Sequence, residues 1–219
     1  MRPKRRLQPM TMDFSFCDYD ARISQLKEAG ILEPTYFEHS VRTAQYLTRL
    51  YSWAVENGLL HEEHTAAQVF VAGLLHDIGK CYIPNTILQK NGPLSDAEYA
   101  AMMLHCVSGA AALKYQEEEI RKIFKADFDF ELVLSVIYAH HERVDGKGYP
   151  FGLHGKNIPL LSKLCAVADT FDAITSDRPY RKGKSFEEAL KIISDCAGTQ
   201  LDAIWSAAFC KCFEQNKTA

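Results

Sequence analysis

Residues 65–80 read Thr-Ala-Ala-Gln-Val-Phe-Val-Ala-Gly-Leu-Leu-His-Asp-Ile-Gly-Lys, an apolar run that ends abruptly in a histidine and an aspartate. The part from Thr65 to Leu75 predicts a strongly apolar helix, which belongs in a protein core. It is shorter than the ~18 residues that a membrane span requires, and a glycine interrupts it. We therefore expect no membrane span. We expect a buried helix with the polar side chains of His76 and Asp77 at its end.

The segments on either side of this run continue the helical pattern. Apolar residues recur at helical spacing, and serines with capping-box spacing precede two of the segments. The alternation typical of strands is missing, so we predict an all-α fold, a single helical bundle. The predicted helices are 36–57, 65–75, one capped by Ser95 that runs through His105 to about Lys114, 130–141, 160–175 and one that begins after Ser185. Residues 145–159 are punctuated by glycine and proline and are expected to form a loop.

Composition excludes several classes of protein. The chain has 219 residues, of which 47% are hydrophobic and 24% charged, as in ordinary folded proteins. Its formal net charge of -3 lacks the basic excess of proteins that bind long nucleic acids. The seven cysteines include no C-x-x-C pair, so neither a disulfide framework nor a thiolate zinc site is indicated, and we expect a cytoplasmic location. The basic residues 1–6 are not followed by the apolar stretch of a signal peptide.

Histidines are concentrated in the predicted apolar helices. A buried imidazole that lacks a hydrogen-bond partner or a metal costs ~1 to 3 kcal/mol, so several together favour a metal site. Imidazoles combined with carboxylates suit Fe, Mn, Co, Ni and Zn. Two such ions ~3.5 to 4 Å apart can activate water for displacement at phosphorus, and Asp77 could supply one oxygen to each. The pattern indicates hydrolysis of a phosphate ester. The five histidines concerned are His39, His76, His105, His140 and His141.

Two motifs resemble those of a known family. Residues 76–80 are similar to the His-Asp signature of the HD phosphohydrolase superfamily, and residues 140–150, His-His-Glu-Arg-Val-Asp-Gly-Lys-Gly-Tyr-Pro, to the extended motif of its HD-GYP subgroup. The similarity covers about Tyr36 to Phe213. It implies a bundle of the HD-domain type with an irregular Gly-Tyr-Pro loop near the metal site. It also implies a metal-dependent phosphodiesterase that hydrolyses cyclic di-GMP to linear pGpG and then, more slowly, to GMP.

The resemblance assigns roles to individual residues. One ion would be held by His39, His76, Asp77 and Asp169, and Asp77 would bridge to a second ion held by His105, His140 and His141. Asp77 and Lys80 are the implied catalytic residues. Contacts with the substrate are implied for Lys80, Tyr149, Arg178 and Arg181. Fe or Mn is expected in both positions, with Ni, Co and Zn as alternatives.

Neighbouring side chains are expected to support this site. We expect Arg143 and Asp145 to pair with each other and brace the loop. Glu142 and Asp172 are expected to hold ligand imidazoles in the right tautomer or to pack between helices.

One position departs from the family's pattern. Some members carry a glutamate four residues before the first histidine ligand, where it helps to bind a third ion, but Thr35 occupies that position here. Two ions are therefore expected rather than three. The resemblance divides the chain into an N-terminal tail with a short helix, residues 1–34, and an HD-GYP catalytic domain, residues 35–215.

Two other functions are alternatives to a cyclic di-GMP phosphodiesterase. The first is a non-catalytic signalling module that binds a cyclic dinucleotide or a diguanylate cyclase, and the complete ligand set argues against it. The second is an HD hydrolase of another nucleotide, which the Gly-Tyr-Pro motif disfavours. The expected partners are cyclic di-GMP or a related cyclic dinucleotide such as cyclic GMP-AMP, and a diguanylate cyclase.

Overall fold

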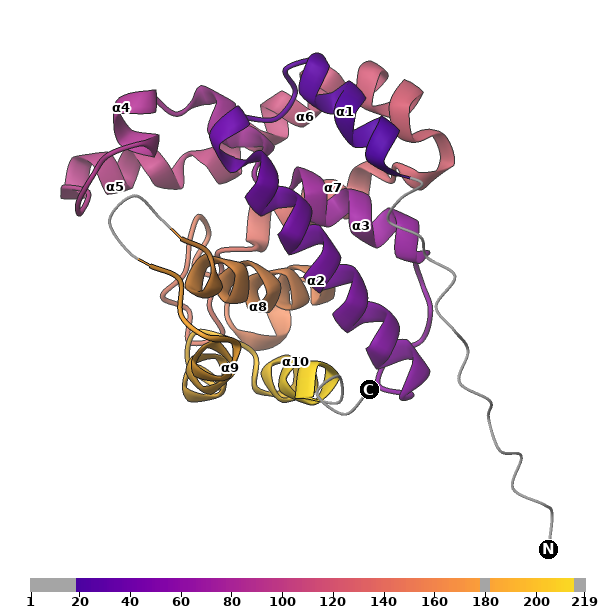
Figure 1. The fold of residues 1–219 in the computed structure, drawn as a ribbon, viewed down its shortest axis with the longest axis vertical. Helices are drawn as coiled ribbons and strands as arrows, with labels where there is room; N and C mark the ends of the chain where they lie inside the picture. The colour runs from indigo at the N-terminus through magenta and orange to yellow at the C-terminus, as the bar shows by residue number, and fades with distance from the viewer. Residues whose placement is uncertain (1–18, 178–181, 215–219) are drawn as a thin grey trace, which may run out of the picture.

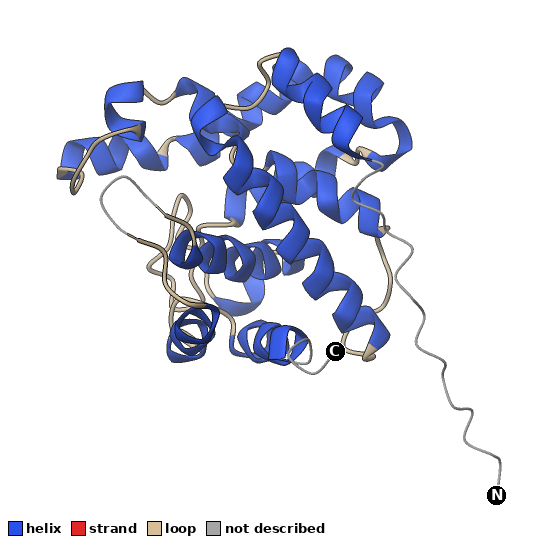
Figure 2. Ribbon diagram, viewed as in Figure 1, coloured by secondary structure: helices blue, strands red, loops and turns tan. Residues whose placement is uncertain are grey.

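The computed structural model describes residues 19–177 and 182–214. This part of the chain is helical and contains no strand, which confirms the predicted all-α fold (Figure 1, Figure 2). Among the described helices, none has both the length and the apolar character of a membrane span. The α and 3₁₀ (η) helices are α1 (Asp20–Glu28), η2 (Pro34–Tyr36), α2 (Phe37–Glu56), α3 (Ala66–Leu75), η3 (Ile78–Tyr82), α4 (Asn85–Leu88), α5 (Asp96–Met103), α6 (His105–Phe124), η4 (Lys125–Asp127), α7 (Phe130–Ala139), η5 (Gly155–Asn157), α8 (Leu160–Thr175), α9 (Phe186–Asp195) and α10 (Ala203–Glu214).

The apolar helix α3 lies at the centre of the bundle. Every residue from Val69 to Leu75 is buried, as the sequence predicts. Helix α3 packs against α2 and α7, and α2 also packs against α8 (Figure 1). The backbones of α2 and α3 come unusually close at Gly73, where an added Cβ would lie 2.8 Å from the Cα of Ala44. This arrangement directs the C-terminal end of α3, and the histidine that follows it, into the interior.

The terminal helices of the described chain pack onto the same core. Near α1, the ring of Tyr19 lies 5.1 Å from that of Phe70 on α3. At the other end, α9 and α10 pack against α8 through aromatic rings, with Phe171 on α8 4.8 Å from Phe186 on α9 and 4.9 Å from Phe209 on α10. Helix α1 packs against α6, and α9 and α10 against α8, so the terminal helices extend the same core. The division of the chain after residue 34 stays a prediction.

Most predicted helix boundaries agree with the structure to about two residues. Helix α2 ends just before Asn57 and Gly58, where the glycine has a φ of +70°, a conformation that suits a residue without a Cβ. Both predicted serine caps form capping boxes, in which Ser95 accepts from the backbone of Glu98, and Ser185 from that of Glu188. Local sequence signals therefore determine these helix ends.

The single helix predicted from Ser95 to about Lys114 is wrong. The chain forms two helices, α5 and α6, separated at Leu104, whose N–H donates to the carbonyl of Ala101 three residues earlier. The tighter turn places His105, the first residue of α6, in the interior with 1% of its surface exposed. Helix α6 also runs beyond the predicted end, because its last turns carry apolar residues that are buried in the core.

The substitution Gly73→Ala tests the close approach of α2 and α3. Alanine is ~1 kcal/mol more favourable than glycine in a helix interior. The added methyl group would, however, be forced against the Cα of Ala44. We expect the packing cost to dominate, so that the free energy of unfolding falls by ~1 to 3 kcal/mol in urea denaturation. A variant more stable than the wild type would contradict this account of the helix pair.

Candidate metal centre

Seven His and Asp side chains converge where α2, α3, α6, α7 and α8 meet. They form two groups, and within each group one potential ligand atom per residue lies within 4.8 Å of the others. These are the seven residues that the sequence analysis selects as metal ligands. The groups are Asp77 with His105, His140 and His141, and His39 with His76 and Asp169.

Asp77 lies between the two groups and is only 3% exposed. Its Oδ1 is 3.3 Å from Nε2 of His105 and 3.6 Å from Nε2 of His140. Its Oδ2 faces the other group, 3.3 Å from Nε2 of His76 and 3.6 Å from Nε2 of His39. Each carboxylate oxygen therefore points toward a different group, as a bridging ligand requires.

Backbone carbonyls determine which nitrogen of three imidazoles faces the centre. The Nδ1–H of His76 donates to the carbonyl of Gly73 at 2.7 Å, and that of His105 to Met102 at 2.6 Å. The Nδ1–H of His140 donates to Val136 at 2.9 Å. Because a carbonyl can only accept, Nδ1 carries a proton in each ring, and Nε2 is the nitrogen that faces the centre and can bind a metal ion.

Two buried polar atoms at the centre have no hydrogen-bond partner among the described residues. They are Nε2 of His76 and Oδ1 of Asp77. An unsatisfied buried polar atom costs ~1 to 3 kcal/mol, so native structures seldom contain one without a reason. Both atoms are acceptors that point into a His and Asp cluster, and a cation would satisfy both. The residues present therefore fit a metal site.

A carboxylate outside the cluster orients His39. Nδ1 of His39 lies 2.7 Å from Asp172, and Arg42 pairs with the same carboxylate at 2.6 Å. The structure thus gives Asp172 the tautomer-holding position that the sequence predicts for it. On the other side of the ring, Nε2 of His39 is 3.1 Å from Oδ1 of Asp169.

The pKa values of His105 and His141 shift in the opposite direction from that of His39. Burial lowers the pKa of His105 to about 4 and that of His141 well below its usual value, so both rings are neutral at pH 7. Burial also acts to lower the pKa of His39, but the carboxylates of Asp169 and Asp172 outweigh it and raise the pKa to about 9. The surroundings of His39 therefore favour a positive charge, which a proton or a metal ion can supply.

Lys80 contributes a cation directly beside the bridging carboxylate. Its Nζ contacts Oδ2 of Asp77 and lies 4.0 Å from the centroid of the Tyr36 ring. Burial tends to lower the pKa of Lys80, but Asp77 and Tyr36 outweigh burial and raise it, so the ammonium is charged at neutral pH. Burial tends to raise the pKa of Asp77, but Lys80 and His76 hold it well below its usual range.

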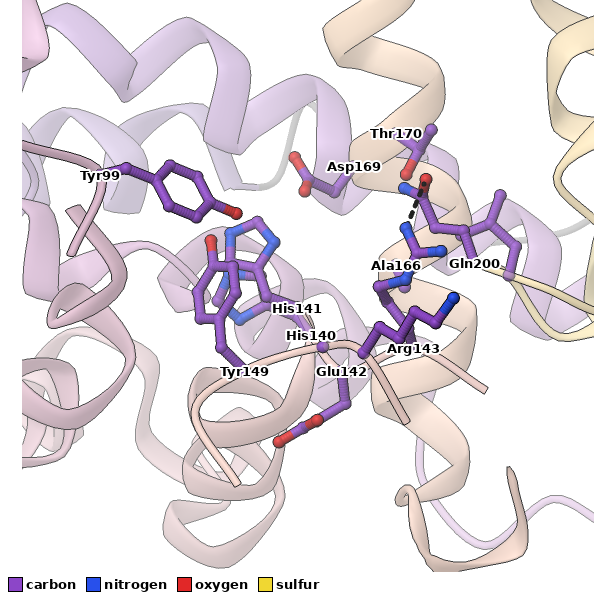
Figure 3. A pocket seen from close by; sticks show the side chains of 13 residues that line it. Tyr99, His140, His141, Glu142, Arg143, Tyr149, Ala166, Asp169, Thr170 and Gln200 are labelled. Atoms are coloured by element: carbon purple, nitrogen blue, oxygen red, sulfur yellow. Dashed lines mark hydrogen bonds between the residues drawn. The ribbon is translucent and has the colours of Figure 1, made fainter. Parts of the chain in front are cut away.

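A cavity of about 390 Å³ opens beside the candidate metal centre, next to His140 and His141 (Figure 3). His140, His141 and Asp169 contribute to its lining. The ring of Tyr149, from the predicted Gly-Tyr-Pro loop, stacks on His141 at 4.7 Å and with an interplanar angle of 29°. The loop thus borders the metal centre, where the sequence analysis expects it. A ligand in this cavity would contact both the loop and the centre.

The loop is braced by the ion pair that the sequence predicts. Arg143 donates to the two oxygens of Asp145 at 3.0 and 2.7 Å, and holds the pKa of Asp145 at about 2. Gly148 is required because a Cβ there would overlap the backbone of Glu142 and Arg143. Gly146, with a φ of +75°, leaves room for the ring of His154.

Glu142 supports the loop and does not contact an imidazole in the described structure. Its carboxylate accepts from the backbone N–H of Phe151 at 2.7 Å and from that of Leu153 at 2.9 Å. The expectation that Glu142 holds a ligand imidazole is therefore wrong. Its carboxylate turns away from the centre because two loop amides need acceptors there.

Thr35, the position that departs from the family's pattern, lies in a helix cap. The side chain of Glu33 accepts from the backbone N–H of Thr35 and Tyr36 and from the hydroxyl of Thr35. The nearest glutamate in sequence is thus engaged in capping η2. Two predicted substrate-binding residues, Arg178 and Arg181, lie outside the described residues.

The structure adds two cavity residues that the sequence analysis missed. Tyr99, on α5, lies 6.2 Å from the ring of Tyr149, and Gln200 accepts from Nη1 of Arg143 at 3.3 Å. Both side chains line the cavity (Figure 3). Neither carries a sequence signal, since a tyrosine on an amphipathic helix and a glutamine in a connecting segment are common.

The chain matches a protein-family model described as HD domain over residues 31–204. A cyclic di-GMP phosphodiesterase of Thermotoga maritima is 34% identical over 203 residues, which are 90% of this chain and 51% of that protein. One of Pseudomonas aeruginosa is 44% identical over 128 residues, 58% of this chain and 28% of that protein. A 3'3'-cGAMP-specific phosphodiesterase of Vibrio cholerae is 37% identical over 157 residues, 72% of this chain and 33% of that protein. The chain thus spans from 28% to 51% of the length of these relatives.

Solved structures share the helical fold. A cyclic GMP-AMP specific phosphodiesterase of Vibrio cholerae superposes with a TM-score of 0.61 at 19% identity, covering 90% of this chain and 49% of the other. An HDG"Y"P protein from Bdellovibrio bacteriovorus superposes with a TM-score of 0.60 at 20% identity, covering 91% and 60%. At these identities the likeness concerns the fold, and it confirms the bundle of the HD-domain type.

The substitution Glu142→Gln tests how the loop is anchored. Glutamine offers one acceptor oxygen where the carboxylate offers two, so one of the two loop amides loses its partner. We expect faster hydrogen exchange at the amide of Phe151 or Leu153 and a loss of ~1 to 3 kcal/mol in the free energy of unfolding. Glu118→Gln, the same change at an exposed position of α6, should alter neither quantity. Unchanged exchange in Glu142→Gln would show that the loop does not depend on this anchor.

Proposed function

Because this chain belongs to the HD domain family, we propose that it is a metal-dependent phosphodiesterase that hydrolyses a cyclic dinucleotide, cyclic di-GMP in the first place. The observation that carries the proposal is the position of Asp77, buried between two groups of ligands with one oxygen toward each. The names of the relatives, cyclic di-GMP and 3'3'-cGAMP phosphodiesterases, support the choice of substrate class.

Two divalent transition-metal ions would occupy the centre. His39, His76, Asp77 and Asp169 would hold one, and Asp77, His105, His140 and His141 the other. Fe and Mn are the proposed metals, with Ni, Co and Zn as alternatives, because imidazole nitrogens and carboxylate oxygens suit all of them. When bound, the ions would supply activation of a water molecule and Lewis-acid stabilisation of charge on the phosphate.

The chain's own side chains would bind and orient the substrate. Lys80 places a buried ammonium beside Asp77, where it would attract the phosphate of the substrate. Tyr149 presents its ring at the edge of the cavity and would contact the nucleotide. Arg178 and Arg181, outside the described residues, are retained as predicted substrate contacts. Asp172, braced by Arg42, would keep Nε2 of His39 directed at the centre.

We further propose that two ions are the full complement. A third ion would need an anionic ligand near Thr35, and Glu33 is engaged with backbone amides there. Without a third ion to bind a terminal phosphate, linear pGpG would bind more weakly than the cyclic substrate. The linear product should therefore accumulate before a slower hydrolysis to GMP.

Neither alternative function has an observation in its favour. A non-catalytic binding module needs no complete ligand set, whereas all seven ligand residues converge here. An HD hydrolase of another nucleotide lacks support among the relatives described above. A diguanylate cyclase partner stays a prediction. The cytoplasm is the proposed location, and the six cysteines of the described residues form no disulfide.

The proposed activity is tested with metal-loaded protein and a panel of cyclic di-GMP, cyclic GMP-AMP and cyclic di-AMP. We expect cyclic di-GMP to be hydrolysed to pGpG without a covalent enzyme intermediate. The products are separated and quantified by chromatography. Failure to hydrolyse any member of the panel after anaerobic loading with Fe or Mn would contradict the proposal.

Metal binding should stabilise the fold through Asp77. Mn²⁺ at ~100 times its Kd should raise the free energy of unfolding by ~2.7 kcal/mol, because the ion binds the folded chain and not the unfolded one. Asp77→Asn should abolish this stabilisation in thermal unfolding experiments. Asp195→Asn, the same change at an exposed position at the end of α9, should retain it. Equal stabilisation of both variants would exclude Asp77 as a ligand.

Lys80→Ala should separate substrate binding from metal binding. Loss of one charge-assisted hydrogen bond, ~1.5 to 3 kcal/mol, should lower kcat/KM for cyclic di-GMP by ~10- to 100-fold. The metal content, measured by elemental analysis, should stay at two ions per chain. Lys122→Ala, at an exposed position of α6, serves as the control. A stoichiometric loss of metal in Lys80→Ala would show that Lys80 supports the centre and not the substrate.

A further inference from the structure

The cavity over the metal centre has two unlike walls (Figure 3). Tyr99 and Tyr149 form an aromatic wall on one side. Arg143 and Gln200 form a polar wall on the other, and His141 lies between the two walls. A cyclic dinucleotide whose phosphate lies at the centre would therefore present different parts to two chemically different surfaces.

The polar wall is a continuous chain of hydrogen bonds. Nε and Nη2 of Arg143 donate to the two oxygens of Asp145, and Nη1 donates to Oε1 of Gln200. The backbone reinforces this arrangement, because the N–H of Val144 donates to the carbonyl of Gln200 at 3.4 Å and that of Asp145 to the carbonyl of Thr199 at 3.0 Å. Gln200 is thus held against the Gly-Tyr-Pro loop by both its backbone and its side chain.

This chain of bonds determines which groups of the polar wall remain available to a ligand. Oε1 of Gln200 faces Arg143 and accepts from it, so the other end of the amide, the NH₂ group, which can only donate, points away from Arg143. The ammonium of Lys147, another residue of the cavity lining, is a donor as well. Gln200 and Lys147 therefore offer two donors to whatever enters the cavity, and the hydroxyl of Thr170, also in the lining, can either donate or accept.

The two donors, the NH₂ group of Gln200 and the ammonium of Lys147, distinguish the two purine bases. The Hoogsteen edge of guanine carries two acceptors, O6 and N7, whereas adenine pairs the N7 acceptor with an N6 amino donor. Guanine would satisfy the NH₂ group of Gln200 and its neighbours. Adenine would place a donor against donors and leave both unsatisfied, which is how polar sites reject a wrong ligand.

We propose that Gln200, oriented by Arg143, is a specificity-determining residue that binds the O6 and N7 edge of guanine in one half of the cyclic dinucleotide. This inference rests on the proposed function, since it requires the phosphate to lie at the metal centre. The aromatic wall, Tyr99 and Tyr149, stacks on the other half of the ligand, and stacking accepts any base. One base is therefore recognised by its edge, and the other is not.

The substrate preference of matched variants tests this assignment. We compare kcat/KM for cyclic di-GMP and cyclic di-AMP in the wild type, Gln200→Glu and Gln25→Glu. The wild type should prefer cyclic di-GMP, and Gln200→Glu, which replaces the donor with an acceptor, should lower this preference about tenfold. Gln25→Glu, the same change at an exposed position of α1, should leave it unaltered.

A second variant, Gln200→Asn, keeps the proposal testable if Gln200→Glu does not fold. Gln200→Asn keeps the amide but withdraws it by one methylene from Arg143 and from the cavity, and should also lower the preference for cyclic di-GMP. An equal loss of kcat/KM on both substrates in the two variants would overturn the proposal. It would mean that the donors bind phosphate oxygens, which both substrates share.

The ratio of the two linear isomers formed from cyclic GMP-AMP is an independent test of guanine recognition. If one wall recognises guanine, this substrate binds in one orientation, and one of its two phosphodiester bonds is opened first, so one linear isomer should predominate. Equal amounts of the two isomers would overturn the proposal. A wild type that hydrolyses no cyclic dinucleotide would defeat the proposed function itself, whereas an active wild type whose preference is unchanged in Gln200→Glu defeats only this inference.

Discussion

The structure depends on a carboxylate, Asp77, held in the interior among four imidazoles and one ammonium. Burial of a charge is costly unless the charge is paired, and Lys80 supplies the pairing that keeps this carboxylate ionised. The remaining acceptor capacity is directed at the two ligand groups, one oxygen toward each. The helices that converge on Asp77 can thus be understood as the scaffold that presents ligands to it.

Helix termination explains how the imidazoles are oriented. The last carbonyls of an α-helix have no partner within the helix. His76 follows the end of α3 and His140 the end of α7, and each donates its Nδ1–H to a carbonyl of the last turn that also accepts from its own backbone N–H. His105 donates its Nδ1–H to a carbonyl at the end of α5. One set of hydrogen bonds therefore holds each imidazole against a helix end and directs its Nε2 toward the candidate metal centre.

The sequence predicts the fold and the seven converging residues because the signals are local or belong to specific motifs. The break at Leu104 is not predictable in this way, since the residues around it favour a continuous helix and only the interior position of His105 requires the turn. The anchoring role of Glu142 depends on where loop amides lie in space. Tyr99 and Gln200 reach the cavity from segments far apart in sequence, so only the tertiary structure brings them together.

The proposed phosphodiesterase site consists of a buried carboxylate, two groups of ligands, and a cavity that has an aromatic wall and a polar wall. Its central claim is that Asp77 bridges two metal ions. Anomalous diffraction at the absorption edge of the bound metal, from crystals of protein purified without chelator, tests this claim most directly. We predict two anomalous peaks, one beside each oxygen of Asp77. A single peak, or peaks that lie away from Asp77, would contradict it.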